Sequence, residues 1–371
     1  MRRELVRAAR QHLLVGALTL ALVGGISVSN PGVAQATTTH PAPDCGCGDV
    51  TTYTFSPQGA ALFGSDTYLV FTPDSYTGRT AVPLVVVTHG CDTTAAEQEG
   101  ASDYDQLAEK YGFIVMYPDD NDRVHVGGCW NWEAPFDWQR GRSDLAVIVG
   151  MTKAVMFTYR IDPKRVYEIG MSAGALLSSD LAAAYPDVYA AVGIMAGGPY
   201  GAGEVCVASG NDPPSAIYDP EITLSANGAY QEEAARKRVI PVIVLNGDAD
   251  NVVNPLCDQL AVAQWLETDN LVIEGSTAGP LSLTPSSTVH GQVPNGYSYQ
   301  VLNYTEPSGC LIAQHWIIHG MGHDWSGGTS NPAYRSYTDP KGPSASEASW
   351  DFLSHYTLGS TSGRCAEVPS S

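Results

Sequence analysis

Short apolar runs alternate along the chain with longer stretches in which apolar residues recur every three or four positions. The short runs predict β-strands at residues 67–71, 83–88, 113–117, 165–169, 190–195, 239–245 and 315–318. The run at 83–88 is almost entirely apolar, which is typical of a strand buried on both faces within a parallel sheet.

Two of the longer stretches predict helices. Residues 143–160 place Leu145 and the apolar residues that follow it on one helical face. Residues 102–111 carry a second such face, with Ser102 in position to cap the helix and Gly112 in position to end it. The alternation of strands and helices predicts an α/β fold with a mostly parallel central sheet and helices on both faces.

The domain organisation follows from where this alternation begins and ends. One domain is expected at residues 67–358, preceded by an extension at 37–66 and followed by a short polar tail at 359–371. The stretches 201–237 and 275–296 are rich in Gly, Ser and Pro, and we expect both to be surface excursions from this domain.

The start of the chain predicts a signal peptide at residues 1–36. Arginines precede an apolar run at 13–28, and Ala-Gln-Ala at 34–36 supplies the small residues of a cleavage site. The run is short and Gly-rich for a membrane span, which leaves an uncleaved anchor as the alternative. We therefore expect a secreted, extracellular protein without a stable membrane anchor.

Composition narrows the classes of partner. The 371 residues are 44% apolar and 16% charged, which excludes a wholly disordered or fibrous chain. A net charge of −20 opposes binding to nucleic acids and to anionic polymers, whereas neutral substrates are tolerated. We expect a monomer that acts on a small or polymeric substrate.

The predicted export bears on whether the eight cysteines form disulfides. An even number of cysteines in an oxidising compartment favours disulfides, although their spacing does not give the connectivity. Cys45 and Cys47 could alternatively bind a metal, but no second Cys or His pair lies nearby in the sequence. No metal or cofactor is expected.

One short motif indicates nucleophilic catalysis. Gly-Met-Ser-Ala-Gly at 170–174 directly follows the predicted strand 165–169 and opens a helical stretch. A nucleophile elbow needs small residues on both sides of its serine because the strand-to-helix turn is tight. The motif predicts Ser172 as a nucleophile, the alternative being a turn serine between ordinary glycines.

Partners for this serine follow later predicted strands. Asp248 and Asp250 come just after one strand and His323 after the next, so the order Ser, Asp, His is that of an α/β-hydrolase. We assign Asp250 as the acid because its Gly-x-x-Asp context resembles the usual acid loop, with Asp248 as the alternative. His323 would remove the proton from Ser172, and Asp250 would orient the imidazole.

An oxyanion hole requires two backbone N–H groups close to the nucleophile. The Thr-His-Gly-Cys stretch at 88–91 lies at the end of a predicted strand, where the donor loop of such folds is found. The backbone N–H groups of Cys91 and Ala173 are therefore the candidates.

Several stretches together resemble a known family. They are His-Gly-Cys at 89–91, Tyr-Gly-Phe-Ile-Val-Met-Tyr-Pro at 111–118, Cys-Trp-Asn-Trp at 129–132, Arg-Ile-Asp-Pro at 160–163, Gly-Pro-Tyr-Gly at 198–201 and Gly-Met-Gly-His-Asp-Trp-Ser-Gly-Gly at 320–328. This pattern resembles the secreted esterases grouped with polyhydroxybutyrate depolymerases and feruloyl esterases. The resemblance covers roughly residues 67–356 and implies Ser172, Asp250 and His323 as a catalytic triad.

The resemblance implies a serine carboxylic-ester hydrolase that acts on a polyester of the polyhydroxybutyrate type. A feruloyl or acetylxylan esterase of plant cell-wall polysaccharide is the alternative within this class. A catalytically silent binding protein with a hydrolase fold is the alternative from a different class.

Three residues near these motifs are expected in substrate binding, namely His89, Trp130 and Trp325. The tryptophans could equally belong to the core, because Trp usually buries most of its surface. A Cys91–Cys129 disulfide is also predicted, since both cysteines are expected at the same edge of the sheet and Cys129 opens a segment resembling the substrate wall. Other pairings among the cysteines remain open.

Overall fold

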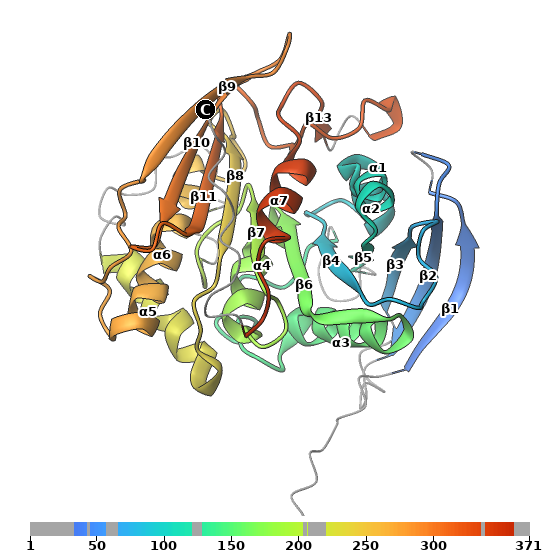
Figure 1. Ribbon diagram of the computed structural model, residues 1–371, viewed down its shortest axis with the longest axis horizontal. Coiled ribbons are helices and arrows are strands. Elements are labelled where there is room, and N and C mark those ends of the chain that lie inside the picture. The colour runs from blue at the N-terminus through green and yellow to red at the C-terminus, as the bar shows by residue number, and fades with distance from the viewer. Residues whose placement is uncertain are drawn as a thin grey trace, which may run out of the picture. The chain divides into compact units, whose positions relative to one another are not determined.

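An eleven-stranded mixed sheet forms the centre of the fold (Figure 1). The computed structural model describes residues 33–42, 45–56, 66–120, 128–202, 206, 220–334 and 338–359. The strands of this sheet are β1 (Val33–His40), β2 (Asp49–Ser56), β3 (Asp66–Thr72), β4 (Val82–Thr88), β5 (Ile114–Pro118), β6 (Ile161–Met171), β7 (Val192–Met195), β8 (Val242–Gly247), β9 (Ser287–Gln292), β10 (Ser298–Thr305) and β11 (Leu311–Ile318). Their order across the sheet is β1-β2-β3-β5-β4-β6-β7-β8-β11-β10-β9.

The sheet is parallel at its centre and antiparallel at both edges. Neighbouring strands from β5 through β4, β6, β7 and β8 to β11 are parallel. Strands β1 to β3 at one edge and β9 and β10 at the other are added antiparallel. The prediction of a mostly parallel sheet therefore holds for the centre alone. Apart from β3, predicted at 67–71, the sequence predicts only the central strands, because these are buried on both faces and strongly apolar.

Helices cover both faces of the sheet, as predicted. They are α1 (Ala95–Ser102), α2 (Tyr104–Tyr111), α3 (Ser143–Thr158), α4 (Ala173–Ala184), α5 (Pro220–Glu233), α6 (Pro255–Glu274) and α7 (Ala345–Leu353). Leu84 and Val86 of β4 belong to the core shared with α3, α4 and α6, whereas Val85 and Val87 belong to the core shared with α1, α2 and α7. This division explains why the run at 83–88 contains almost no polar residue.

The helix predicted at 102–111 is divided differently in the structure. Ser102 ends α1 and caps nothing, because Asp103 adopts a left-handed conformation with φ of 58° and breaks the helix there. The predicted end is correct: Gly112 has φ of 73°, and its N–H donates to the carbonyl of Ala108. Glycine adopts this conformation without the steric cost that a side chain would add.

Both predicted surface excursions contain regular structure, and the first of them is partly buried. The stretch 201–237 includes α5, which packs against α4 and α6 and buries Ala226 and Ala229. The stretch 275–296 includes β9, an edge strand in which half-buried and exposed residues alternate. Neither element has the apolar pattern by which the central strands were found, since α5 carries Asn-Gly in its interior and β9 is mostly polar.

Most of the predicted signal peptide lies outside the described residues. Strand β1 crosses the predicted cleavage position after Ala36 and pairs with β2, which comes from the predicted extension at 37–66. The tail beyond residue 359 also lies outside the described part of the chain. Within the part that is described, no helix is long and apolar enough to cross a membrane.

Candidate active site

The predicted nucleophile elbow lies between the end of β6 and the start of α4. Ser172 stands between them with φ of 57° and ψ of −120°, a conformation that costs energy for any residue except glycine. A Cβ atom added at Gly170 would lie 2.3 Å from the carbonyl carbon of Gly174, and one added at Gly174 would lie 2.6 Å from the carbonyl oxygen of His89. The flanking glycines are therefore required by close backbone contacts on both sides of the serine.

Three loops at the carboxyl edge of the sheet bring the predicted triad together. His323 Nε2 lies 2.8 Å from Ser172 Oγ, and His323 Nδ1 lies 2.7 Å from Asp250 Oδ2. The other oxygen of Asp250 accepts hydrogen bonds from the backbone N–H groups of Val252 and Val253, at 2.8 and 3.0 Å. The Asp250 side chain is fully buried, whereas the His323 side chain keeps 15% of its surface exposed.

Asp248, the alternative acid, binds a different histidine. Its carboxylate accepts from the Gly320 N–H at 2.7 Å and lies 2.8 Å from His319 Nδ1. Burial acts to raise the pKa of Asp248, but the Gly320 N–H and His319 outweigh it and hold the pKa below its usual value. Asp248 thus links the loop after β8 to the loop after β11, which carries His323.

The loop after β4 lies directly against the nucleophile. A Cβ atom added at Gly90 would come within 3.0 Å of Ser172 Cβ. Among the described residues, the backbone N–H groups of Cys91 and Ala173 have no hydrogen-bond acceptor. The predicted Cys91–Cys129 disulfide is present, with a Cα–Cα distance of 4.3 Å. It joins this loop to the Trp-containing segment at 129–132.

His89 begins this loop and Trp130 packs against it, and both side chains are buried. Trp130 Nε1 donates to the His89 carbonyl at 2.8 Å, and the two rings are 4.7 Å apart between centroids. The His89 ring lies 2.7 Å from the Gly90 carbonyl and accepts from the Asp120 N–H at 3.3 Å, and burial lowers its pKa so that it is neutral at physiological pH. These contacts favour a role in holding the loop over direct contact with substrate.

Trp325 is fully buried in the core shared with α2 and α7. Its ring packs edge-on against Tyr104, and its Nε1 donates to Ser346 Oγ at 3.2 Å. Of the two interpretations of this tryptophan, its surroundings favour the core.

Glu168 beneath the elbow is a residue that sequence analysis missed. Its Oε1 accepts hydrogen bonds from the hydroxyls of Thr88 at 2.9 Å and Ser178 at 3.1 Å, and both hydroxyls also lie within 3.2 Å of the Gly174 carbonyl oxygen. Burial raises the pKa of Glu168 to about 8, despite these donors. The available signal was an acidic residue within the otherwise uncharged run at 166–171.

A second set of buried polar side chains holds the segment 197–201, which follows β7 and packs on α4. Three of them accept from backbone N–H groups of this segment: Asp258 from Gly197 at 2.8 Å, Gln264 from Tyr200 at 3.0 Å and Asp180 from Gly201 at 3.0 Å. A Cys206–Cys257 disulfide lies at the start of α6, next to Asp258. The segment is therefore fixed on the side of the nucleophile opposite the loop after β4.

No metal centre is apparent in the part of the chain that the structure describes. No group of three or more His, Cys, Asp or Glu side chains there is placed to hold an ion. Cys45 and Cys47, which could have been metal ligands, form a disulfide with each other.

A serine, a histidine and a carboxylate in contact at the ends of β6, β11 and β8 of a mixed α/β sheet are the arrangement found in α/β-hydrolases. The particular family follows from residues 67–279, which match the family described as Esterase PHB depolymerase. The chain belongs to this family of esterases.

The sequence of this chain is similar to those of a named depolymerase and a named feruloyl esterase. The chain is 32% identical over 249 residues to poly(3-hydroxyalkanoate) depolymerase C of Paucimonas lemoignei, covering 65% of this chain and 54% of the relative. It is 35% identical over 138 residues to feruloyl esterase B of Talaromyces funiculosus, covering 37% and 38% of the two chains. The match thus spans about half the length of the depolymerase and less of the feruloyl esterase.

A solved structure supports the fold independently. The acetyl xylan esterase from Aspergillus awamori superposes with a TM-score of 0.53 at 19% identity, covering 82% of this chain and 97% of that one. At this identity the likeness concerns the fold alone.

Proposed function

We propose that this protein is a serine carboxylic-ester hydrolase with Ser172, His323 and Asp250 as its triad. The observation that carries the proposal is the pair of contacts of His323, 2.8 Å to the serine hydroxyl and 2.7 Å to the carboxylate. These distances lie within the range for proton transfer and for orientation of the imidazole.

The reaction proceeds in two halves. Ser172 Oγ attacks the ester carbonyl carbon while His323 Nε2 takes its proton, and Asp250 stabilises the imidazolium that forms. When the tetrahedral intermediate collapses, His323 gives this proton to the leaving alcohol oxygen and an acyl-enzyme remains. Water then attacks the acyl carbon with His323 again as base, and the acid is released with Ser172 restored.

The negative charge on the carbonyl oxygen is stabilised by the backbone N–H groups of Cys91 and Ala173. Two features support this assignment: neither group has an acceptor among the described residues, and Gly90 lies against the Ser172 side chain. Ala173 also begins α4, so its N–H sits at the positive end of the helix dipole. Loss of one such donor typically costs about 2.7–4 kcal/mol of transition-state stabilisation.

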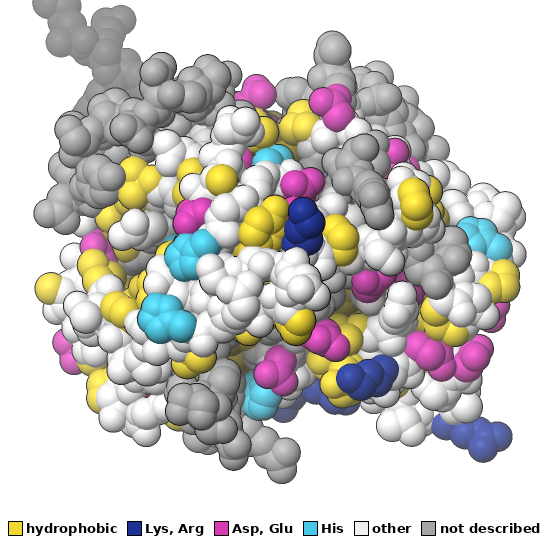
Figure 2. Space-filling view, turned by 90° about the horizontal axis from the view of Figure 1, so that it is seen from above, with side chains coloured by type: hydrophobic (Ala, Val, Ile, Leu, Met, Phe, Trp, Pro, Cys, Tyr) yellow, Lys and Arg dark blue, Asp and Glu magenta, His cyan; other side chains and the backbone are white. Residues whose placement is uncertain are grey.

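The leading substrate is a polyester of the polyhydroxybutyrate type. The family match and the depolymerase relative support it. The net charge of −20 and the few Lys and Arg side chains on the face shown in Figure 2 suit an uncharged polymer. Feruloyl or acetylxylan ester hydrolysis is the second candidate, supported by the relative named feruloyl esterase B and by a relative named probable acetylxylan esterase A that is 32% identical over 153 residues.

Turnover of p-nitrophenyl acetate, with and without a serine-directed phosphonate, tests the catalytic proposal. We expect hydrolysis that the phosphonate abolishes and a phosphonate adduct on Ser172 by peptide mapping. A protein without turnover and without adduct would be a binding protein. Release of soluble products from polyhydroxybutyrate film, measured in parallel with methyl ferulate hydrolysis, then separates the two substrate candidates.

We also propose that the protein is a secreted monomer. The disulfides among the described residues support export, because such bonds persist in oxidising compartments. N-terminal sequencing of protein recovered from the medium should begin at Thr37. Cleavage there would leave the second half of β1, which pairs with residues 50–52 of β2. Sedimentation of the recovered protein measures its oligomeric state.

A further inference from the structure

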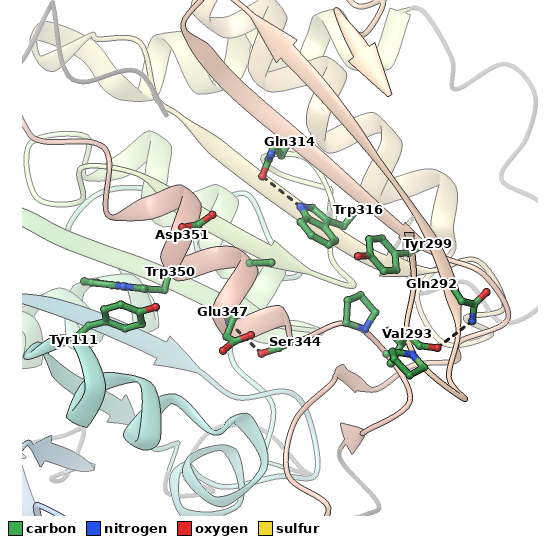
Figure 3. Close-up of a pocket in the computed structure, with 14 residues that line it drawn as sticks. Tyr111, Gln292, Val293, Tyr299, Gln314, Trp316, Ser344, Glu347, Trp350 and Asp351 are labelled. Atoms are coloured by element: carbon green, nitrogen blue, oxygen red, sulfur yellow. Dashed lines mark hydrogen bonds between the residues drawn. The ribbon is translucent and has the colours of Figure 1, made fainter. Parts of the chain in front are cut away.

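A groove with a volume of about 640 Å³ opens between α7 and the strands β9 to β11, and none of the triad residues lines it (Figure 3). One wall carries the aromatic side chains of Tyr299 and Trp316, and the other carries Glu347, Trp350 and Asp351.

The aromatic wall is a platform of two rings stacked one on the other, and its orientation is fixed. The Tyr299 and Trp316 rings are stacked, with centroids 5.3 Å apart and planes 21° apart. Tyr299 lies over Gly291, its partner on β9, so closely that an added Cβ would be 2.2 Å from the ring. Trp316 Nε1 donates to Gln314 Oε1 at 3.3 Å, which holds the indole. Both rings remain half-buried, so part of each is open to solvent.

The polar groups of the groove accept hydrogen bonds more than they donate them. Glu347 and Asp351 are exposed carboxylates, which only accept when they are ionised. None of the residues that line the groove is a Lys, Arg or His. An anionic ligand would therefore meet two like charges among the side chains that line the groove.

We propose that this groove binds a segment of a neutral polysaccharide. A pyranose ring presents a face of C–H groups, which suits an aromatic platform, and a rim of hydroxyl donors, which suits carboxylate acceptors. A polyester has carbonyl acceptors but no donors along its chain, so it satisfies the platform and not the carboxylates. Because the groove lies outside the triad, binding there anchors the polysaccharide and does not depend on ester cleavage.

Affinity electrophoresis tests the proposal with two neutral probes, arabinoxylan and hydroxyethylcellulose, and with anionic polygalacturonate. We expect either neutral polymer to retard the protein and the anionic one to leave its mobility unchanged. Trp316→Ala and Gly291→Ala should each weaken retardation by about tenfold, the first by removing a ring and the second by displacing Tyr299. Glu347→Gln, at an exposed position, should weaken it without altering the platform.

The matched control is Phe157→Ala, which removes another aromatic side chain, 87% exposed, at the end of α3. It should bind like the wild type, and all four variants should keep wild-type turnover of p-nitrophenyl acetate. Ser172→Ala should retain polysaccharide binding, so failure of the esterase proposal would be distinguishable from failure of this one. Mobility unaffected by both neutral polymers, or unchanged by Trp316→Ala and Gly291→Ala, would overturn the proposal. So would retention on polyester granules alone, or a dimer that Trp316→Ala dissociates.

Discussion

Replacing both cysteines of the Cys91–Cys129 disulfide with serine should separate its effect on stability from its effect on catalysis. The bond closes a loop with a sequence separation of 38 residues. In the chain-entropy model, removing a cross-link of this length lowers the free energy of unfolding by about 4 kcal/mol. A second bond, Cys206–Cys257, has a separation of 51 residues and a nearly equal expected loss of about 4 kcal/mol.

The two double variants should differ in turnover. Cys91 carries a proposed oxyanion donor, and the disulfide holds its loop against the segment after Cys129. If the donor moves, kcat should fall, by up to the factor of about 10²–10³ that complete loss of one donor produces. Loss of the Cys206–Cys257 bond leaves this loop tied, so its kcat should change much less.

Urea unfolding followed by tryptophan fluorescence measures the two stabilities, and p-nitrophenyl acetate turnover well below the unfolding midpoint measures kcat. The comparison requires that both variants are folded under assay conditions, which circular dichroism establishes. An equal loss of kcat in the two variants would attribute the effect to general destabilisation. An unchanged kcat without the Cys91–Cys129 bond would refute its role in placing the donor.

Further predictions concern the triad and the group beneath it. Ser172→Ala and His323→Ala should each lower kcat by about four orders of magnitude or more with the fold intact, as circular dichroism would show. Asp250→Asn should reduce kcat strongly, whereas Asp248→Asn, which touches His319 and not the catalytic base, should reduce it only slightly; the reverse order would transfer the acid role to Asp248. A histidine base acts in its neutral form, so the ratio kcat/KM should rise with pH, and a flat profile from about pH 5 to 9 would exclude such a base. Because burial raises the folded-state pKa of Glu168 from 4.5 to about 8, its contribution to stability is fully present below pH 4.5 and is lost as pH rises toward 8. Urea unfolding of Glu168→Gln should therefore show a smaller decline between pH 5 and 8 than the wild type, and identical slopes would contradict this assignment.

The proposed triad could be picked out from the sequence because each of its residues follows an apolar strand within a few residues. Ser172 is marked by the glycines that its turn requires, and the loops of Asp250 and His323 follow strands that are buried on both faces and hence strongly apolar. Contact among Ser172, Asp250 and His323 depends on the order of their strands in the sheet. The order of the motifs along the chain already indicated this arrangement.

Other features depend on tertiary contacts that a local pattern does not contain. Strand β10 pairs with β11 on one side and with β9 on the other, and this pairing brings together segments that the sequence pattern did not connect. The burial of Glu168 and Asp258 is set by the helices packed over them, so the identity of these residues alone suggests the surface. Trp130 and Trp325 lie near the catalytic motifs in sequence, yet the packing of their rings decides that they are buried.

The contacts between the loop after β8 and the loop after β11 have a consequence for recombination among relatives. The Ala249 N–H donates to the Met321 carbonyl at 3.0 Å, and the Asp248 carboxylate binds both His319 and the Gly320 N–H. The loops that carry Asp250 and His323 are thus hydrogen-bonded to each other, although 73 residues separate Asp250 from His323 in the chain. A chimera whose crossover falls between these loops would take one loop from each parent and so would not keep the hydrogen bonds of either parent as a set. Exchanging both loops together would preserve these hydrogen bonds.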